Sequence, residues 1–162
     1  MRTEFQPANL PRDARALAAF DRKVFPKADC FPPSMWLNFE PYWLLVDGVR
    51  AGCCAFDRQA DAAEDLHDPR AHRRRTLYIV STGILPAYQR QGFGDLFKAW
   101  QIAFARRHGF QRIVTNTRKR NKAMIALNRK WGFKIVRTVP QYYAEPADAA
   151  VFLELALCKR KK

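Results

Sequence analysis

The amino-acid sequence predicts a mixed α/β fold, and three observations lead to this prediction. Apolar runs with the β-branched and aromatic composition of strands alternate along the chain with segments of helical periodicity. The 162 residues include no internal repeat, low-complexity tract or interdomain linker. Hydrophobic residues make up 48% of the chain, which is enough to bury one core at this length. We therefore expect one domain over residues 1–157, followed by a basic tail over residues 158–162.

A helix and a strand hairpin are expected first along the chain. Residues 12–25 carry apolar side chains at helical spacing, and Pro26 ends the pattern. Residues 42–46 and 50–56 are apolar runs, and the Asp47-Gly48 pair between them is a strong signal for a two-residue turn between strands. These runs predict an antiparallel hairpin.

The second half of the predicted fold follows a segment without periodicity. Residues 59–74 carry acidic residues before a run of arginines and predict a mobile loop. Residues 76–84 are rich in β-branched and aromatic types, which predicts a strand that ends near Pro86. From about Gly94 to His108 apolar residues again keep helical spacing. The remaining expected elements are a strand over residues 110–115, a helix over residues 121–131 and strands over residues 133–139 and 150–157.

The segment from Gln89 to Gly94 is a candidate phosphate-binding loop. A strand that leads through a glycine-rich loop into a helix directs unpaired backbone N–H groups and the positive end of the helix dipole at one point. Gly92 and Gly94 lack the Cβ atom that would keep a pyrophosphate away, and Gln89 and Arg90 offer side-chain donors. The pattern therefore favours a phosphorylated ligand.

Two other phosphate loops are excluded by the sequence. The dinucleotide fingerprint requires a third glycine where this chain has Phe97, and it requires an acidic residue where the chain has Thr115-Asn116-Thr117. A Walker loop is excluded because the chain has no Gly-Lys-Ser/Thr.

Three motifs resemble those of the GCN5-related N-acetyltransferase (GNAT) family. Ile84-x-Pro86-x-x-Gln89-x-x-Gly92-x-Gly94 is similar to the acetyl-CoA loop of that family. Asn121-x-x-Met124-x-x-Leu127-Asn128-x-x-Trp131-Gly132-Phe133 resembles its second cofactor helix and the turn that follows. Tyr142-Tyr143-Ala144-Glu145, followed by Asp148-Ala149, resembles the hairpin of N-terminal acetyltransferases, including the bacterial ribosomal-protein alanine class. Together with the order and spacing of the predicted strands and helices, the resemblance covers nearly the whole chain.

This resemblance implies a fold, a co-substrate and a set of binding residues. The fold would be a central mixed, mostly antiparallel sheet of six to seven strands, with about four flanking helices and a splayed cofactor groove. The co-substrate would be acetyl-CoA, and the scattered histidines and cysteines give no support for a metal. The implied binding residues are Gly83, Ile84 and Leu85 along the pantetheine arm, Gln89, Arg90, Gln91, Gly92, Phe93 and Gly94 at the pyrophosphate, and Asn121 on the pantetheine side.

The sequence departs from the family pattern at the proton donor. The family often uses a tyrosine to protonate the departing thiolate, but Asn128 stands at the matching position, and a carboxamide is not an acid at neutral pH. Tyr142 and Tyr143 are alternative donors, and hairpin packing or acceptor binding are the other roles open to them. Tyr78 stands where some members carry a glutamate as general base. The other candidates for a base are Glu40, Asp47, Asp57, Glu145, His67 and a chain of water molecules.

The missing base favours an acceptor that is already neutral. An α-amine with a pKa of about 7.7–8.0 is roughly a tenth neutral at pH 7, whereas a lysine amine near ~10.4 is neutral in well under one part in a thousand. The expected acceptor is therefore a protein or peptide N-terminus. The alternatives are a small-molecule amine, or a CoA-binding module without turnover.

The formal net charge of +14 predicts attraction to polyanions. The basic clusters are Arg70, Arg73, Arg74 and Arg75, then Arg118, Lys119, Arg120, Lys122, Arg129 and Lys130, then residues 159–162. CoA phosphates, or weak association with nucleic acid or the ribosome, would use this charge, and a plain solvated surface is the alternative. The chain has neither a signal-peptide pattern nor a membrane-spanning apolar run, so we expect a cytoplasmic monomer or homodimer without a membrane partner.

Overall fold

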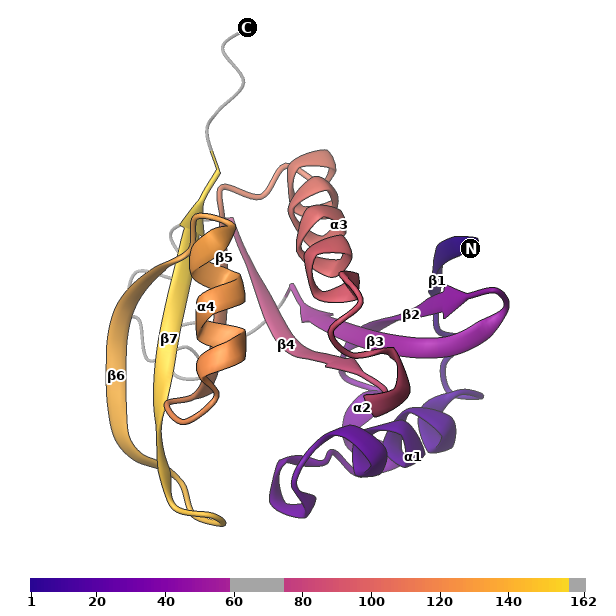
Figure 1. The fold of residues 1–162 in the computed structure, drawn as a ribbon, viewed down its shortest axis with the longest axis horizontal. Helices are drawn as coiled ribbons and strands as arrows, with labels where there is room; N and C mark the ends of the chain where they lie inside the picture. Colours follow the sequence, from indigo (N-terminus) through magenta and orange to yellow (C-terminus); the bar gives the residue numbers. More distant parts are fainter. Residues whose placement is uncertain (59–74, 158–162) are drawn as a thin grey trace, which may run out of the picture. The chain divides into compact units, whose positions relative to one another are not determined.

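The computed structural model describes residues 1–58 and 75–157 (Figure 1). The expected loop over residues 59–74, with His67 and most of the first arginine cluster, lies outside these residues. So does the expected tail over residues 158–162. Within the described ranges, no helix has both the length and the apolar character needed to cross a bilayer.

Seven strands form one sheet in the hydrogen-bonded order β1-β2-β3-β4-β5-β7-β6. Their bounds are β1 Thr3–Pro7, β2 Glu40–Val46, β3 Val49–Asp57, β4 Thr76–Ile84, β5 Arg112–Arg118, β6 Lys134–Tyr143 and β7 Asp148–Ala156. The pairs β1–β2, β2–β3, β5–β7 and β6–β7 are antiparallel, whereas β4–β5 is parallel. The prediction of a mixed, mostly antiparallel sheet is confirmed.

Within residues 1–58 and 75–157, four α-helices and two short 3-10 turns accompany the sheet. The helices are α1 Ala14–Val24, α2 Pro33–Trp36, α3 Phe93–Arg107 and α4 Lys122–Lys130, and the 3-10 turns are Lys27–Asp29 and Pro86–Tyr88. Gly109 and Gly132 follow α3 and α4 with φ of 71° and 88°, the left-handed conformation in which helices commonly end.

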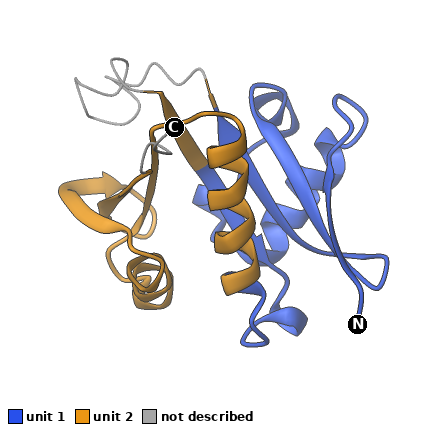
Figure 2. Cartoon of the chain, turned by 90° about the horizontal axis from the view of Figure 1, so that it is seen from above, with its two compact units in different colours: residues 1–57, 80–94 blue, residues 58–79, 95–162 orange. Residues whose placement is uncertain are grey.

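The chain divides into two compact units, coloured separately in Figure 2. Unit 1 contains residues 1–57 and 80–94, and unit 2 contains residues 58–79 and 95–162. The strand β4 and the helix α3 each contribute residues to both units.

Unit 1 is built on the antiparallel strands β1, β2 and β3, with α1 and α2 packed against them. The turn between β2 and β3 has positive φ at Asp47 (48°) and Gly48 (83°), as the sequence predicts for a two-residue hairpin turn. The buried core of this unit joins residues from both helices and both long strands, namely Leu17, Phe20, Trp36, Trp43, Cys53 and Ala55. This core fixes α1 against the end of β4, where the candidate loop begins.

Unit 2 is built on β5, β7 and β6, and the first half of β4 pairs with β5 from Thr76 opposite Arg112 to Ile79 opposite Thr115. Figure 1 shows α4 alongside the ribbon of β5, β7 and β6. The buried Arg112 donates to Thr76 and forms an ion pair of 3.0 Å with Glu154, so one side chain links β4, β5 and β7.

Candidate functional site

The loop between β4 and α3 turns through two residues with positive φ, Arg90 (59°) and Gly92 (87°). A Cβ atom placed on Gly92 would meet nothing within 4 Å, so space is not what requires glycine at this position. The backbone conformation requires it, because side-chain-bearing residues rarely adopt this φ. The open side of Gly92 leaves its backbone accessible to a ligand such as a pyrophosphate.

Two glutamine side chains brace the loop from within. Gln89 donates from Nε2 to the Ile84 carbonyl at 3.0 Å, and Gln91 donates from Nε2 to the Ala87 carbonyl at 2.8 Å. Both predicted site residues therefore hold the shape of the turn. Arg90 is the exposed side chain between them that could reach a phosphate.

Phe93 anchors the start of α3. Its side chain is buried, and its ring centroid lies 6.1 Å from that of Tyr88 in the preceding 3-10 turn. Phe93 and Gly94 are the first residues of α3, whose first-turn N–H groups have no partner within the helix. A short loop that leads directly into a helix, as the sequence predicts, is present here.

The β4 segment before the loop is closely packed in unit 1. A Cβ atom on Gly83 would lie 3.0 Å from the Val24 side chain and 3.1 Å from that of Phe25, so any larger residue here would have to displace these side chains. The Leu85 N–H donates to the Ala51 carbonyl, and the Ile84 carbonyl accepts from Gln89. The Leu85 carbonyl accepts from the Tyr88 N–H at 2.8 Å. Each of the Ile84 and Leu85 carbonyls therefore already accepts one hydrogen bond, and its second lone pair is the acceptor that a pantetheine amide could use.

In unit 2, Asn121 and Asp95 fix the ends of helices. The Asn121 side chain accepts from the Met124 N–H at 3.1 Å and so caps the N-terminus of α4. Asp95, in the first turn of α3, accepts from Trp131 Nε1 at 2.8 Å and pairs with Lys130 at 2.8 Å. The bonds from Lys130 and Trp131 lower the pKa of the Asp95 carboxyl. The carboxylate is thus tied to the end of α4.

Asn128 is the buried residue of α4, with 1% of its surface exposed. Its Nδ2 donates to the Met124 carbonyl at 3.0 Å, which identifies the other atom as the oxygen. No group in the described part of the chain donates to that Oδ1. Asn128 therefore presents an unsatisfied buried acceptor, which a bound amide or hydroxyl donor would satisfy.

Tyr143 belongs to a chain of side-chain hydrogen bonds across β4, β5 and β6. The Tyr78 hydroxyl donates to Asn116 Oδ1, and Asn116 Nδ2 donates to the Tyr143 hydroxyl at 3.1 Å. Because the Tyr143 oxygen accepts this bond, its own hydrogen is directed away from Asn116. Tyr142 is 38% exposed, and its ring lies 5.0 Å from that of Tyr143 and 5.9 Å from that of Phe152. The predicted site residue Tyr143 is thus held in this polar chain.

Tyr78 and Asn116 were not predicted as site residues. Tyr78 lies opposite Val114 in the parallel register, and Asn116 is two residues further along β5. Residues two apart in a strand share a face of the sheet, so a diagonal contact between the strands is within reach of a tyrosine. Strand alternation could have found the pair once the parallel register was known.

The basic cluster before α4 is not a uniform solvated surface. Arg118 is 7% exposed and Arg120 pairs with Asp148 at 3.1 Å, whereas Lys119 and Lys122 are exposed. Among the base candidates, Glu40 accepts from the Tyr42 hydroxyl at 2.7 Å and Glu145 is exposed on the turn between β6 and β7. In the described ranges, no group of three or more His, Cys, Asp or Glu residues converges as a metal site would.

Comparison with known proteins assigns residues 12–133 to the family model "Acetyltransferase (GNAT) family". Over 106 residues, or 64% of this chain, the sequence is 35% identical to the "Probable N-acetyltransferase san" of Drosophila melanogaster and 30% identical to "N-alpha-acetyltransferase 50" of Danio rerio. The matched segments cover 51% and 56% of those proteins, so the chain spans about half the length of the curated relatives it matches.

Solved structures share the fold at low identity. The ribosomal-protein-S18-alanine N-acetyltransferase from Escherichia coli superposes with a TM-score of 0.78 at 16% identity, covering 99% of both chains. Arabidopsis thaliana NAA60, solved in complex with acetyl-CoA, superposes with a TM-score of 0.77 at 14% identity, covering 96% of this chain and 99% of that one.

Proposed function

Because the chain belongs to the acetyltransferase (GNAT) family, we propose that it transfers the acetyl group of acetyl-CoA to a primary amine. The observation that carries this proposal is the loop between β4 and α3. Gly92 turns there with an open side, two glutamines brace the turn, and the loop leads directly into the first turn of α3. Such a loop binds a pyrophosphate through backbone N–H groups and the helix dipole.

We assign the binding of the co-substrate to the residues predicted for it. The backbone from Arg90 to Gly94 would hold the pyrophosphate, with the Arg90 side chain as an added donor. The Ile84 and Leu85 carbonyls would accept from the pantetheine amides. The Asn128 Oδ1 is buried and accepts no hydrogen bond from the described residues, so a pantetheine N–H would satisfy it.

We assign proton transfer to Tyr143. When acetyl-CoA is bound, its thioester supplies the electrophilic carbonyl that the neutral amine attacks, and the carbon–sulfur bond breaks to release a thiolate. The Tyr143 hydroxyl would give this thiolate a proton and regain one from solvent, while the new amide loses its extra proton to water. The hydrogen bond from Asn116 supports this role because it orients the hydroxyl hydrogen.

We propose that the acceptor is the α-amine of a protein or peptide. Two relatives named above act, by their names, on N-termini or on a ribosomal-protein alanine. The hydrogen-bonded chain that reaches the Tyr143 hydroxyl is made of the neutral side chains of Asn116 and Tyr78, which lack the strength to deprotonate a lysine. The pKa of an α-amine is lower than that of a lysine amine. Forming the neutral α-amine at pH 7 therefore costs about 3–4 kcal/mol less than forming the neutral lysine amine.

A turnover screen tests this proposal. Purified protein and acetyl-CoA are incubated with lysine-free peptides bearing an open N-terminus, with N-terminally blocked lysine peptides, or with small primary amines. Thiol release and the mass of the acetylated product are measured. We expect turnover chiefly with open N-termini, and we expect Tyr143→Phe to lower kcat by roughly 10²-fold or more, the size of general-acid help. The neighbouring Tyr142→Phe is the matched control and should keep kcat within about twofold of the parent, because it removes a hydroxyl that we give no part in proton transfer.

The other outcomes distinguish the alternatives. Faster acetylation of lysine peptides or small amines would overturn the α-amine acceptor but keep the acetyltransferase. Tight acetyl-CoA binding without thiol release from any amine would instead identify a CoA-binding module, and equal rates in the two tyrosine variants would remove Tyr143 from the mechanism.

A further inference from the structure

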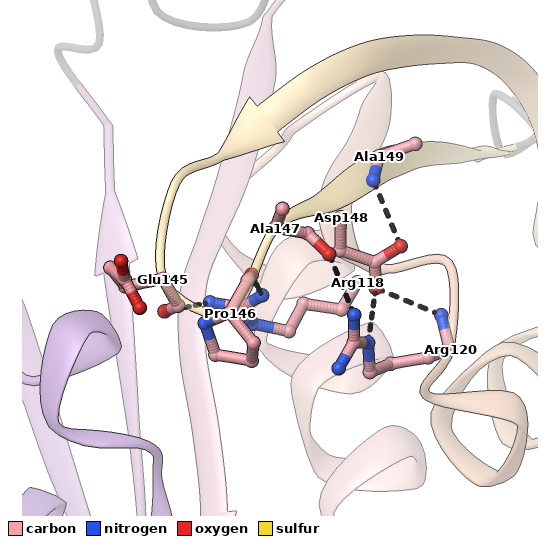
Figure 3. Close-up of polar contacts among 7 residues, drawn as sticks. All are labelled: Arg118, Arg120, Glu145, Pro146, Ala147, Asp148 and Ala149. Atoms are coloured by element: carbon pink, nitrogen blue, oxygen red, sulfur yellow. Dashed lines mark hydrogen bonds and ion pairs between the residues drawn. The ribbon is translucent and has the colours of Figure 1, made fainter.

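Arg118, the last residue of β5, is a buried arginine whose donors are directed at the turn between β6 and β7. It donates from Nη2 to the Glu145 carbonyl at 2.9 Å and from Nη1 to the Pro146 carbonyl, so the guanidinium spans two successive peptide groups (Figure 3). Only 7% of the residue is exposed. The turn is therefore held from the end of a central strand.

The same guanidinium lies against the ring of Tyr143. Its central carbon is 4.2 Å from the ring centroid, within the range of a cation–π contact. The opposite end of the Tyr143 side chain, the hydroxyl, accepts from Asn116. Tyr143 is thus positioned at its ring face by Arg118 and at its hydroxyl by Asn116.

Neighbouring contacts complete the attachment of the turn. Arg120 donates from Nε to Asp148 Oδ2 at 3.1 Å and from Nη2 to the Ala147 carbonyl at 2.6 Å. The backbone N–H of Arg120 also donates to Asp148 Oδ2 at 3.1 Å. The Lys119 N–H donates to the Ala149 carbonyl at 2.9 Å. In Figure 3 the Glu145 carboxylate points away from both arginines, so the Glu145 backbone, and not its charge, meets Arg118.

The chemistry of this position requires arginine. Burying a cation costs free energy unless hydrogen bonds replace its water, and backbone carbonyls do so here. The planar guanidinium can donate to two carbonyls in its plane while its face lies on a phenol ring. A lysine ammonium is a point charge and cannot meet both carbonyls and the ring in this geometry.

We propose that Arg118 is a positioning residue for acetyl transfer: it places the Tyr143 hydroxyl by fixing both the Tyr143 ring and the β6–β7 turn. This inference rests on the proposed function, because it assigns Arg118 an effect on turnover through Tyr143. Displacing a reacting group by about 1 Å can cost roughly 10²-fold in rate. We therefore expect Arg118→Met to lower kcat about 10- to 100-fold and to leave the KM for acetyl-CoA within about twofold.

The test is a double-mutant cycle with a surface control. The parent, Arg118→Met, Tyr143→Phe and the double variant are assayed for thiol release with an open N-terminal peptide. Arg129→Met removes an exposed arginine from the same basic cluster and is the matched control. Arg118→Lys keeps the charge and the aliphatic stem, so it provides a folded variant if the methionine variant fails to fold.

The expected result is that Arg118→Met loses kcat in the parent but has little further effect when Tyr143 is already phenylalanine, because the hydroxyl that Arg118 places is gone. Arg118→Lys should not restore kcat. If the losses of kcat in the two single variants add in the double variant, the inference is overturned and Arg118 acts on stability alone. A kcat for Arg118→Met equal to that of Arg129→Met would overturn it as well. A parent that releases no thiol with any amine would instead refute the proposed function itself.

Discussion

Gly92 and Gly83 both belong to the segment that we assign to the co-substrate, but each is glycine for a different reason. At Gly83 a Cβ atom would press on Val24 and Phe25, whereas at Gly92 it would stand in open space and only the backbone φ is unfavourable for other residues. Packing thus fixes the first position and conformation fixes the second.

This difference predicts the effect of Gly92→Ala. A residue other than glycine costs about 1–2 kcal/mol in the left-handed conformation. The loop of the alanine variant therefore favours another backbone conformation, and this strain must be overcome when acetyl-CoA binds. We expect weaker acetyl-CoA binding by up to roughly tenfold, measured by calorimetry, because about 1.4 kcal/mol corresponds to tenfold in Kd.

Gly48→Ala is the matched control for that experiment. Gly48 has a similar φ of 83° and equally open surroundings, but it lies in the turn between β2 and β3. It should lose similar stability and keep the affinity of the parent. Equal Kd values for the two variants would count against a pyrophosphate at Gly92.

The site residues that the sequence did not predict depend on tertiary contacts. The loop residues could be predicted because they are consecutive and their glycine pattern has a local physical reason. Asn116 joins Tyr78 and Tyr143 only through the register of β4, β5 and β6, which the sequence pattern leaves open. Arg118 belongs to a run of basic residues that predicts an exposed surface, and its burial results from the β6–β7 turn folding back over it.

At the scale of elements, the strongly patterned segments were predicted and the short ones were not. The long helices, the β2–β3 hairpin and β4 agree with the structure within a few residues. The edge strand β1 has only five residues, four of them exposed, and α2 has four, which is too short to display helical periodicity. β6 extends beyond the predicted end at residue 139 as far as Tyr143, despite Pro140, because it pairs only with β7 and lies at the edge of the sheet.

The helix α1 carries a buried carboxyl that makes its attachment dependent on pH. Asp21 is 1% exposed and accepts from the Phe31 N–H at 3.0 Å. Burial raises the pKa of Asp21 from 3.8 to about 6, although the bond from Phe31 opposes the rise. Ionisation is therefore less favourable in the folded than in the unfolded chain, and the stability that the neutral form provides is lost as pH rises from about 4 through about 6.

Asp21→Asn should remove this dependence. Asparagine keeps an acceptor for the Phe31 N–H and stays neutral, so we expect the variant to gain stability over the parent as pH rises, by about 3 kcal/mol at most near pH 7. Urea unfolding of both proteins between pH 4 and pH 7 measures the difference. Carboxyls with lowered pKa values, such as Asp148, change the free energy of unfolding with pH in the same way in both proteins, so their effect cancels in the difference. A constant difference across this range would contradict the raised pKa.

For the whole molecule, the net charge of +14 predicts a preference among acceptors. A positive field attracts anionic peptides and repels polyamines, and salt screens both effects over a Debye length of about 8 Å at physiological ionic strength. We expect kcat/KM to be higher for open N-terminal peptides followed by acidic residues than for the same peptides followed by lysines, with the ratio approaching one as salt increases. A ratio that does not change with salt would point to local contacts in place of the overall field.

The division into two units has a consequence for any attempt to study them apart. Unit 1 is made of two stretches of chain, residues 1–57 and 80–94, with part of unit 2 threaded between them. No single cut of the chain therefore yields either unit whole: a chain that ends at residue 57 lacks residues 80–94 of unit 1, and a chain that begins at residue 95 lacks residues 58–79 of unit 2. A fragment that preserved unit 1 would need a new linker in place of residues 58–79, and one that preserved unit 2 would need a linker in place of residues 80–94, which cuts β4 and α3 in both cases.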